Sequence, residues 1–255
     1  MSSAPTPLVE MRGVKFQFAN KVILDGIDFS VRPQEVLVIM GLSGGGKSTL
    51  LSILMGLLKP SGGSVCFKGE DLTKLSRPKL NEVRTHIGMV YQNAALISSM
   101  TVRDNVGLPL KELSDKKAKE IDRIVDQKLE LVELTEAKDK LPSELSGGMQ
   151  KRVGLARALA LEPELVLFDE PSAGLDPITG KHIDDLIVQL RDKQEVTSIV
   201  VTHEMDCAFA VATCMAFLHG GKIIFEGTPK EFRQSRIPII EKFLSPYLQR
   251  DHATP

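Results

Sequence analysis

Apolar and polar residues alternate along the first part of the chain, in residues 8–18 and again in residues 22–31. Alternation with a period of two is typical of strands that bury one face and expose the other. We therefore expect two half-buried antiparallel strands. Asn20 and Lys21 are predicted to form the turn between them.

Continuous apolar runs replace this alternation further along. Residues 36–40 lead into a glycine-rich loop, and residues 48–58 after the loop have helical character. Two more apolar runs, 165–168 and 198–201, are separated by a helical stretch at 178–193. Buried strands joined by crossover helices are typical of parallel sheets. The predicted fold is α/β, with a parallel-sheet core and an N-terminal antiparallel β subdomain.

A charged, helix-prone region, residues 102–140, separates the two halves of the predicted core. Its apolar residues recur at helical spacing, which predicts an inserted helical subdomain over about residues 94–158. The residues expected to face its interior are Ile121, Ile124, Val125, Leu129 and Val132.

The end of the chain predicts a hairpin over residues 215–226 and a short helix from Pro229. We expect a single domain over residues 8–235 and a C-terminal extension, 236–255. The extension has helical character as far as Arg250 and no ordering pattern after it.

Charge and cysteine content narrow the class of protein. With 32 basic and 33 acidic residues the net charge is −1, so no general attraction to nucleic acid is expected. The three cysteines lack CxxC spacing, which argues against a zinc site or a disulfide framework and favours a reducing compartment. No secretory signal is evident, and the most apolar helical run, residues 50–58, is about half the length that crosses a bilayer.

Residues 41–48, GLSGGGKS, match the phosphate-loop pattern between an apolar strand and a helix. The glycines let backbone N–H groups face phosphates, Lys47 reaches the β- and γ-phosphates, and Ser48 is a ligand for Mg²⁺. The alternative is a flexible glycine loop that meets the pattern by chance, in roughly one chain in a hundred. The predicted ATP contacts of this segment are Gly41, Ser43, Gly44, Gly45, Gly46, Lys47, Ser48 and Thr49.

A buried strand pattern ends in two adjacent carboxylates, Asp169 and Glu170. Because burying both without a cation is costly, Asp169 is a candidate Mg²⁺ ligand and Glu170 a candidate base for the attacking water. Without the phosphate loop, a helix cap would be the better explanation.

Ser146, Gly147 and Gly148 precede a helical run at 151–161. Exposed N–H groups at a helix start can hold an anion, although an N-capped surface helix explains the same pattern.

Taken together, the phosphate loop, Gln92, residues 145–150, the Asp169 and Glu170 pair and His203 resemble the ABC ATPases in order and approximate spacing. The resemblance covers almost the whole chain and implies a RecA-like core that hydrolyses ATP with Mg²⁺. It also implies a homodimer in which Ser146 to Gly148 of one subunit close on the nucleotide of the other.

The resemblance implies further roles. Gln92 would contact Mg²⁺ and the attacking water, and His203 would act on the γ-phosphate. Asp176 would link the two sites of the dimer, although a helix cap is the alternative. Phe18 would stack on adenine, although Phe16 and Phe18 alternate as core strand residues would.

Three stretches, 93–110, 142–149 and 174–178, are similar to the MlaF-type ATPases of phospholipid transport. That similarity implies a location on the cytoplasmic face of the inner membrane, a separate permease that contacts residues 93–100, an MCE-domain protein and a STAS-domain protein. Ser172 and Ala173 depart from the usual hydroxyl pair of the family loop. An ATPase of a small-solute transporter and a soluble ABC clamp remain as alternatives.

Overall fold

The computed structural model describes residues 6–251, and the side chains of residues 6–248. Strands β1 (Val9–Phe18) and β2 (Lys21–Val31) pair antiparallel, as predicted. The turn consists of Ala19 and Asn20, whereas Lys21 is already in β2 and pairs with Phe18. The predicted turn was therefore one residue late, because Ala19 adopts the left-handed φ of 51° that the tight connection needs.

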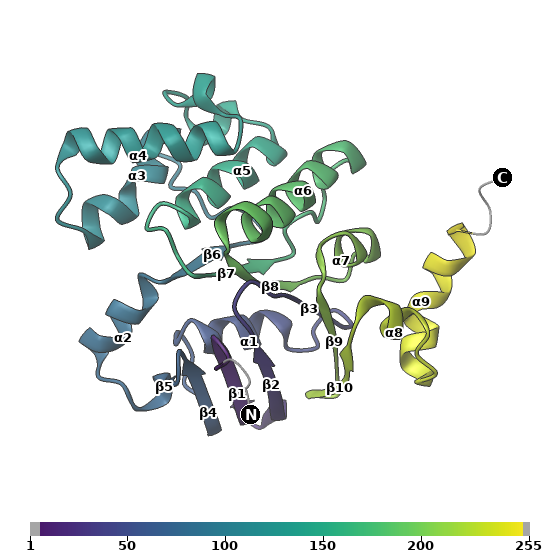
Figure 1. Cartoon of the computed structure of the whole chain (residues 1–255). Coiled ribbons are helices and arrows are strands. Elements are labelled where there is room, and N and C mark those ends of the chain that lie inside the picture. The colour runs from purple at the N-terminus through teal and green to yellow at the C-terminus, as the bar shows by residue number, and fades with distance from the viewer. Residues whose placement is uncertain (1–5, 252–255) are drawn as a thin grey trace, which may run out of the picture.

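Two sheets build the core (Figure 1). The first has the order β2-β1-β4-β5 and includes β4 (Gly62–Phe67) and β5 (Glu70–Asp71). The second has the order β10-β9-β3-β8-β7-β6, in which the contiguous strands β9, β3, β8, β7 and β6 run parallel. The α/β prediction is confirmed. The strands of the second sheet are β3 (Val36–Met40), β6 (Ile87–Val90), β7 (Leu165–Asp169), β8 (Thr197–Val201), β9 (Cys214–His219) and β10 (Lys222–Gly227).

Strand β3 is buried on both faces, which explains its continuous apolar run. Leu37 and Ile39 belong to the core shared with the first sheet and α1 (Lys47–Leu54). Val38 and Met40 belong to the second core cluster, on the opposite side of the strand. Helix α1 ends four residues before the predicted end, because Gly56 turns the chain with a φ of 64°.

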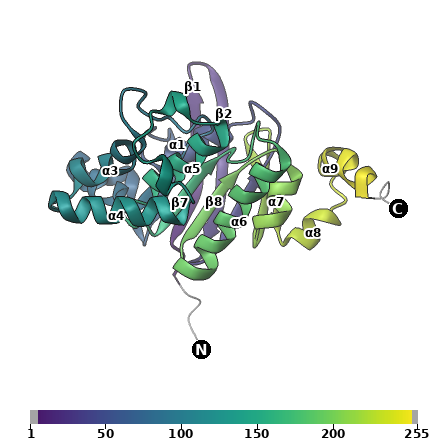
Figure 2. The same cartoon turned by 90° about the horizontal axis from the view of Figure 1, so that it is seen from above.

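The inserted region holds α3 (Val102–Leu113), α4 (Ala118–Leu131) and α5 (Gly147–Ala158), which contact one another. Figure 2 shows them together at one side of the molecule, opposite the C-terminal helix. All five apolar residues predicted to face the interior of this region are buried. Helix α5 begins at Gly147, four residues before the predicted helical run, because the side chain of Ser146 caps it.

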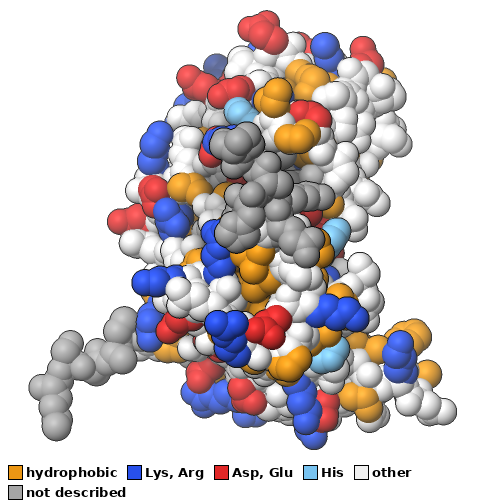
Figure 3. Space-filling view, turned by 90° about the vertical axis from the view of Figure 1, so that its right-hand side faces the viewer, with side chains coloured by type: hydrophobic (Ala, Val, Ile, Leu, Met, Phe, Trp, Pro, Cys, Tyr) orange, Lys and Arg blue, Asp and Glu red, His pale blue; other side chains and the backbone are white. Residues whose placement is uncertain are grey.

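The remaining helices are α2 (Arg77–Arg84), α6 (Pro177–Gln194), α7 (Met205–Val211), α8 (Pro229–Arg233) and α9 (Pro238–Asp251). The hairpin of β9 and β10 and the short helix from Pro229 are confirmed. Helix α9 packs on the core through Ile240 and Leu244, and includes Asp251, which was expected to lie beyond the helix. Residues 252–255, also expected to lack order, fall outside the described residues. Basic and acidic side chains are interspersed on the α9 side of the molecule (Figure 3).

Candidate functional site

The phosphate-loop segment lies between the end of β3 and the start of α1. Gly46 caps α1 with a φ of 98°. A Cβ at this position would lie 3.0 Å from a methyl carbon of Leu24 and 3.1 Å from one of Ile23. Both the backbone conformation and the close approach of β2 therefore require glycine here. Ser43 and Gly44 are exposed at the tip of the loop, and Gly45, Gly46 and Thr49 are partly buried.

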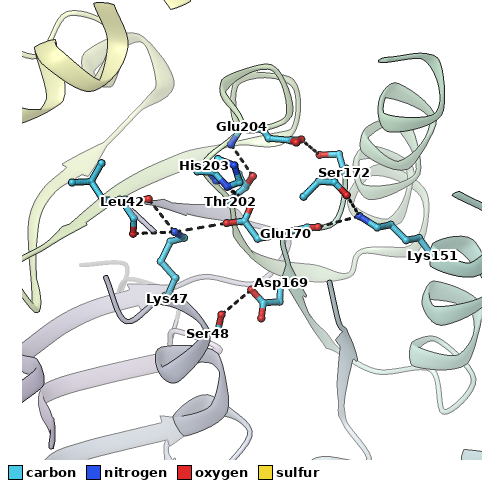
Figure 4. A network of polar contacts seen from close by, with 12 residues as sticks. Leu42, Lys47, Ser48, Lys151, Asp169, Glu170, Ser172, Thr202, His203 and Glu204 are labelled. Atoms are coloured by element: carbon cyan, nitrogen blue, oxygen red, sulfur yellow. Dashed lines mark hydrogen bonds and ion pairs between the residues drawn. The ribbon is translucent and has the colours of Figure 1, made fainter. Parts of the chain in front are cut away.

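Lys47 is buried and its ammonium points back across the loop (Figure 4). The Nζ atom donates to the backbone oxygen of Gly41 at 2.9 Å and to that of Leu42 at 3.3 Å. It also lies 3.7 Å from Oε1 of Glu170. The structure thus brings together the lysine and the carboxylate that the sequence nominated separately.

Ser48 lies opposite the end of β7. Its hydroxyl donates a hydrogen bond of 3.1 Å to Oδ1 of Asp169. Burial raises the pKa of Asp169 above its usual range, and the hydrogen bond from Ser48 opposes that effect. Hydroxyl and carboxylate oxygens are ligands that Mg²⁺ accepts, so these two residues fit a magnesium ion that draws its other ligands from a nucleotide and water. Within the described residues, no three His, Cys, Asp or Glu side chains are grouped as a metal site of their own.

Glu170 is buried, and its backbone has the left-handed φ of 49°. This conformation ends β7. The side chain of Glu170 lies at the edge of the sheet where the parallel strands β3 and β8 also end (Figure 4). Oε2 of Glu170 accepts a hydrogen bond of 3.2 Å from the backbone N–H of His203 and lies 2.9 Å from Nδ1 of its ring. The side chain of His203 is half-exposed. Asp169, Glu170 and His203 therefore form one cluster with Lys47.

Ser146 caps α5 by accepting a hydrogen bond of 3.3 Å from the backbone N–H of Met149. The N-capped helix that the residues alone favoured is therefore confirmed. Ser146 and Gly147 are exposed, and Gly148 packs against Thr179 of α6. No hydrogen bond or ion pair of the described residues joins this segment to the phosphate loop of the same chain. Its role as an anion cradle stays a prediction.

Among the described residues, no hydrogen bond or ion pair joins the three remaining candidates to this cluster. Gln92 is exposed just after β6. Asp176 is exposed and caps α6 by accepting from the N–H groups of Ile178 and Thr179, at 3.1 and 3.0 Å, so the helix-cap reading holds within the chain. Phe18 is 73% exposed at the end of β1 and is therefore no core residue. Phe16 packs against the core instead.

Lys151 was not among the sequence candidates. It is buried on α5, and its Nζ donates to the backbone oxygens of Ala173, at 2.6 Å, and Glu170, at 3.4 Å. Its distance in sequence from Glu170 gives no sign of this contact. The only signal in the sequence was the place of this lysine at the start of the predicted helical run, 151–161.

Comparisons with known proteins agree with this arrangement. A model of the ABC transporter family matches residues 24–173. The intermembrane phospholipid transport system ATP-binding protein MlaF of Haemophilus influenzae is 40% identical over 237 residues, 93% of this chain and 90% of that protein. The probable ribonucleotide transport ATP-binding protein mkl of Mycobacterium leprae is 38% identical over 93% of this chain and 68% of its own length.

Among solved structures, the dimeric post-hydrolysis state of the ATP-binding cassette MJ0796 bound to ADP and Pi superimposes with a TM-score of 0.79. Its sequence is 32% identical, and the match covers 86% of this chain and 98% of that one.

Within residues 6–251, no helix combines the length and hydropathy needed to cross a membrane. The family match, the relatives and the cluster around Lys47 and Glu170 lead to one conclusion: this chain belongs to the ABC transporter family, as an ATP-binding subunit whose ATP hydrolysis is coupled to transport.

Proposed function

We propose that this chain energises phospholipid transport between bacterial envelope membranes through a separate permease. The observation that carries the ATPase part is the convergence of Lys47, Glu170 and His203 at one edge of the parallel sheet. The lipid part rests on the relative named for intermembrane phospholipid transport, which matches along nearly the full length of both chains.

ATP would bind over the start of α1. The backbone N–H groups of Gly44 to Ser48 and the partial positive charge of the helix start attract phosphate oxygens. Lys47, which donates to two loop carbonyls, would exchange them for the β- and γ-phosphates. The exposed ring of Phe18 is available to stack on adenine.

Ser48 and Asp169 would hold Mg²⁺, with Gln92 joining them from the end of β6. When bound, the ion would neutralise phosphate charge and bridge the nucleotide to the protein. Glu170, buried beside Lys47, would accept hydrogen bonding from the attacking water and polarise it. His203 would orient Glu170 and contact the γ-phosphate.

The placement of the Ser146 to Gly148 segment supports a homodimer. Ser146 and Gly147 are exposed, and within residues 6–251 no hydrogen bond or ion pair joins the segment to the phosphate loop of its own chain, so a second subunit would supply the loop that it faces. Asp176 would meet the partner near the same place. The dimeric cassette MJ0796 provides a precedent for such an assembly.

Other parts of the chain would serve assembly with partners. Residues 94–158 would form the helical subdomain of a single domain, 8–235, with residues 93–100 against the permease. An MCE-domain protein and a STAS-domain protein would complete the complex on the cytoplasmic face of the inner membrane. The extension 236–255 would lie outside the catalytic domain.

Purification of the tagged full-length chain from native membranes, followed by identification of bound proteins and lipids, tests this function. We expect a permease, an MCE-domain protein and enrichment of phospholipid over a mock purification. Recovery of a solute-binding protein without an MCE-domain protein would favour the transport of a small polar solute. Recovery of nucleic acid without membrane proteins would favour a soluble clamp.

A further inference from the structure

Helix α5 carries cationic side chains that bind backbone carbonyls in three different loops. Lys151 donates to the oxygens of Glu170 and Ala173. Arg152 donates to the oxygen of Val132 at 2.9 Å, and Arg157 donates to those of Ala94 and Ala95 at 2.7 and 2.8 Å. These three side chains are Lys151, Arg152 and Arg157. Among the described residues, none of them forms an ion pair.

Each of these loops contains a non-glycine residue in the left-handed region. The φ values are 49° at Glu170, 57° at Glu133, and 55° and 48° at Ala94 and Ala95. Residues other than glycine rarely adopt this backbone conformation, and it persists only where the surrounding structure holds it. The cations of α5 are therefore placed where the backbone is under strain.

Of the three loops, the one that Lys151 contacts contains Glu170, the proposed base for ATP hydrolysis. The side chain of Lys151 is 7% exposed, and burial lowers the pKa of its ammonium. An ammonium removed from water without a bound carboxylate is costly, so its two carbonyl contacts must offset much of that cost. The N–H of Ala173 also donates to the oxygen of Glu170, at 3.3 Å, and closes a tight turn. Nζ of Lys151 thus joins both ends of the turn (Figure 4).

A second contact holds the far side of the same turn. The hydroxyl of Ser172 donates to Oε2 of Glu204 at 2.8 Å, and the N–H of Glu204 donates to the hydroxyl of Thr202 at 3.0 Å. This side of the turn is anchored to the segment after β8, which also supplies His203. The other side is attached to α5 through Lys151, and to β8 through the N–H of Glu170, which donates to the oxygen of Val201 at 2.9 Å. The direction of the Glu170 carboxylate therefore depends on these attachments.

We propose that Lys151 is a positioning residue for ATP hydrolysis, which holds the Glu170 turn in its left-handed conformation and ties it to α5, the helix that Ser146 caps. The inference rests on the proposed role of Glu170 as the base.

The test compares variants of the full-length chain purified by one protocol. Lys151→Met removes the ammonium and keeps the length of the side chain, whereas Lys151→Gln keeps an N–H donor without the charge. Arg152→Met is the matched control, because Arg152 is the next residue of α5 and also binds carbonyls, but in a loop away from the site. Glu170→Gln is measured in parallel. The readouts are kcat and KM for ATP, ATP affinity and thermal unfolding.

We expect Lys151→Met to lower kcat about ten- to a hundredfold while ATP affinity changes less than about threefold, since a displaced base costs turnover without costing binding. Lys151→Gln should recover part of the loss, and Arg152→Met should keep the wild-type kcat. Normal kcat in Lys151→Met, or an equal loss in Arg152→Met, overturns the inference. If Glu170→Gln itself hydrolyses ATP normally, the proposed function of Glu170 is what fails.

Discussion

Nδ1 of His203 and Oε2 of Glu170 lie 2.9 Å apart, and the backbone N–H of His203 donates to the same oxygen at 3.2 Å. One carboxylate oxygen is thus held from the segment after β8, while the other lies 3.7 Å from Nζ of Lys47. The strands β7 and β8 pair in parallel with Asp169 beside Val201, which places the residues that follow each strand next to each other. The site therefore depends on strand order as much as on residue type.

Replacement of Glu170 by glutamine should remove the base and keep the shape of the side chain. We expect kcat to fall at least about a hundredfold, with ATP affinity and thermal stability close to those of the wild type. Phosphate release, equilibrium ATP binding and thermal unfolding measure these three quantities. Glu130→Gln, an exposed position on α4, serves as the control and should hydrolyse ATP normally. Wild-type turnover in Glu170→Gln would contradict the assignment.

The two glycines at the start of α5 should respond differently to alanine. A Cβ at Gly148 would overlap the methyl group of Thr179, whereas a Cβ at Gly147 would meet no atom within 4 Å. Gly148→Ala should therefore lower the free energy of unfolding by about 1–3 kcal/mol, as overpacking does. Gly147→Ala should leave it unchanged or raise it by up to about 1 kcal/mol.

Denaturant unfolding measures both variants. Thr179→Ser removes the obstructing methyl group and keeps the hydroxyl, so it should restore most of the stability lost in Gly148→Ala. If the double variant is no more stable than Gly148→Ala alone, steric overlap is not the cause.

Substitutions of Phe18 and Phe16 should affect two different properties, the affinity for ATP and the stability of the fold. Phe18→Ala should raise the Kd for ATP about tenfold, because aromatic stacking on a base contributes about 1–3 kcal/mol. It should leave the melting temperature unchanged, since the ring is 73% exposed. Phe16→Ala should show the opposite result, lower stability with little change in Kd, because that ring packs against the core. An unchanged Kd in Phe18→Ala would place adenine elsewhere.

Asp184 on α6 should make stability depend on pH. Burial raises its pKa to about 6, with like charges nearby on Glu204, Asp185 and Asp206, and the thiol of Cys207 partly opposing the shift. Because this pKa exceeds the unfolded-state value of 3.8, the folded protein binds more protons between about pH 4 and 6. The contribution of Asp184 to the free energy of unfolding therefore falls as pH rises through that window.

Asp184→Asn removes this dependence. Relative to the wild type, its free energy of unfolding should rise by on the order of 1 kcal/mol from pH 5 to pH 8. Asp115→Asn, at an exposed position between α3 and α4, is the control and should show no such trend. A constant difference between Asp184→Asn and the wild type across this range would show that Asp184 has an ordinary pKa.

The periodic parts of the chain were predictable because their patterns are local. The five residues of β3 match the apolar run that predicts a buried strand. The apolar spacing from Ile121 to Val132 correctly predicts the buried face of α4 and the buried residue that follows this helix. Boundaries were less predictable. Ala19 and Gly56 end elements through left-handed backbone conformations, and Ser146 starts α5 through a side-chain cap, all of which depend on single residues.

The sequence by itself determined the fold class and nominated Lys47, Ser48, Asp169 and Glu170, because strand, loop and helix follow one another within short segments. Only the tertiary structure decided which of these side chains meet. The hydrogen bond from Ser48 to Asp169 spans 121 residues, and that from Lys151 to Glu170 spans 19. Such contacts depend on the order of strands in the sheet and on how α5 packs against it. No local pattern encodes that order.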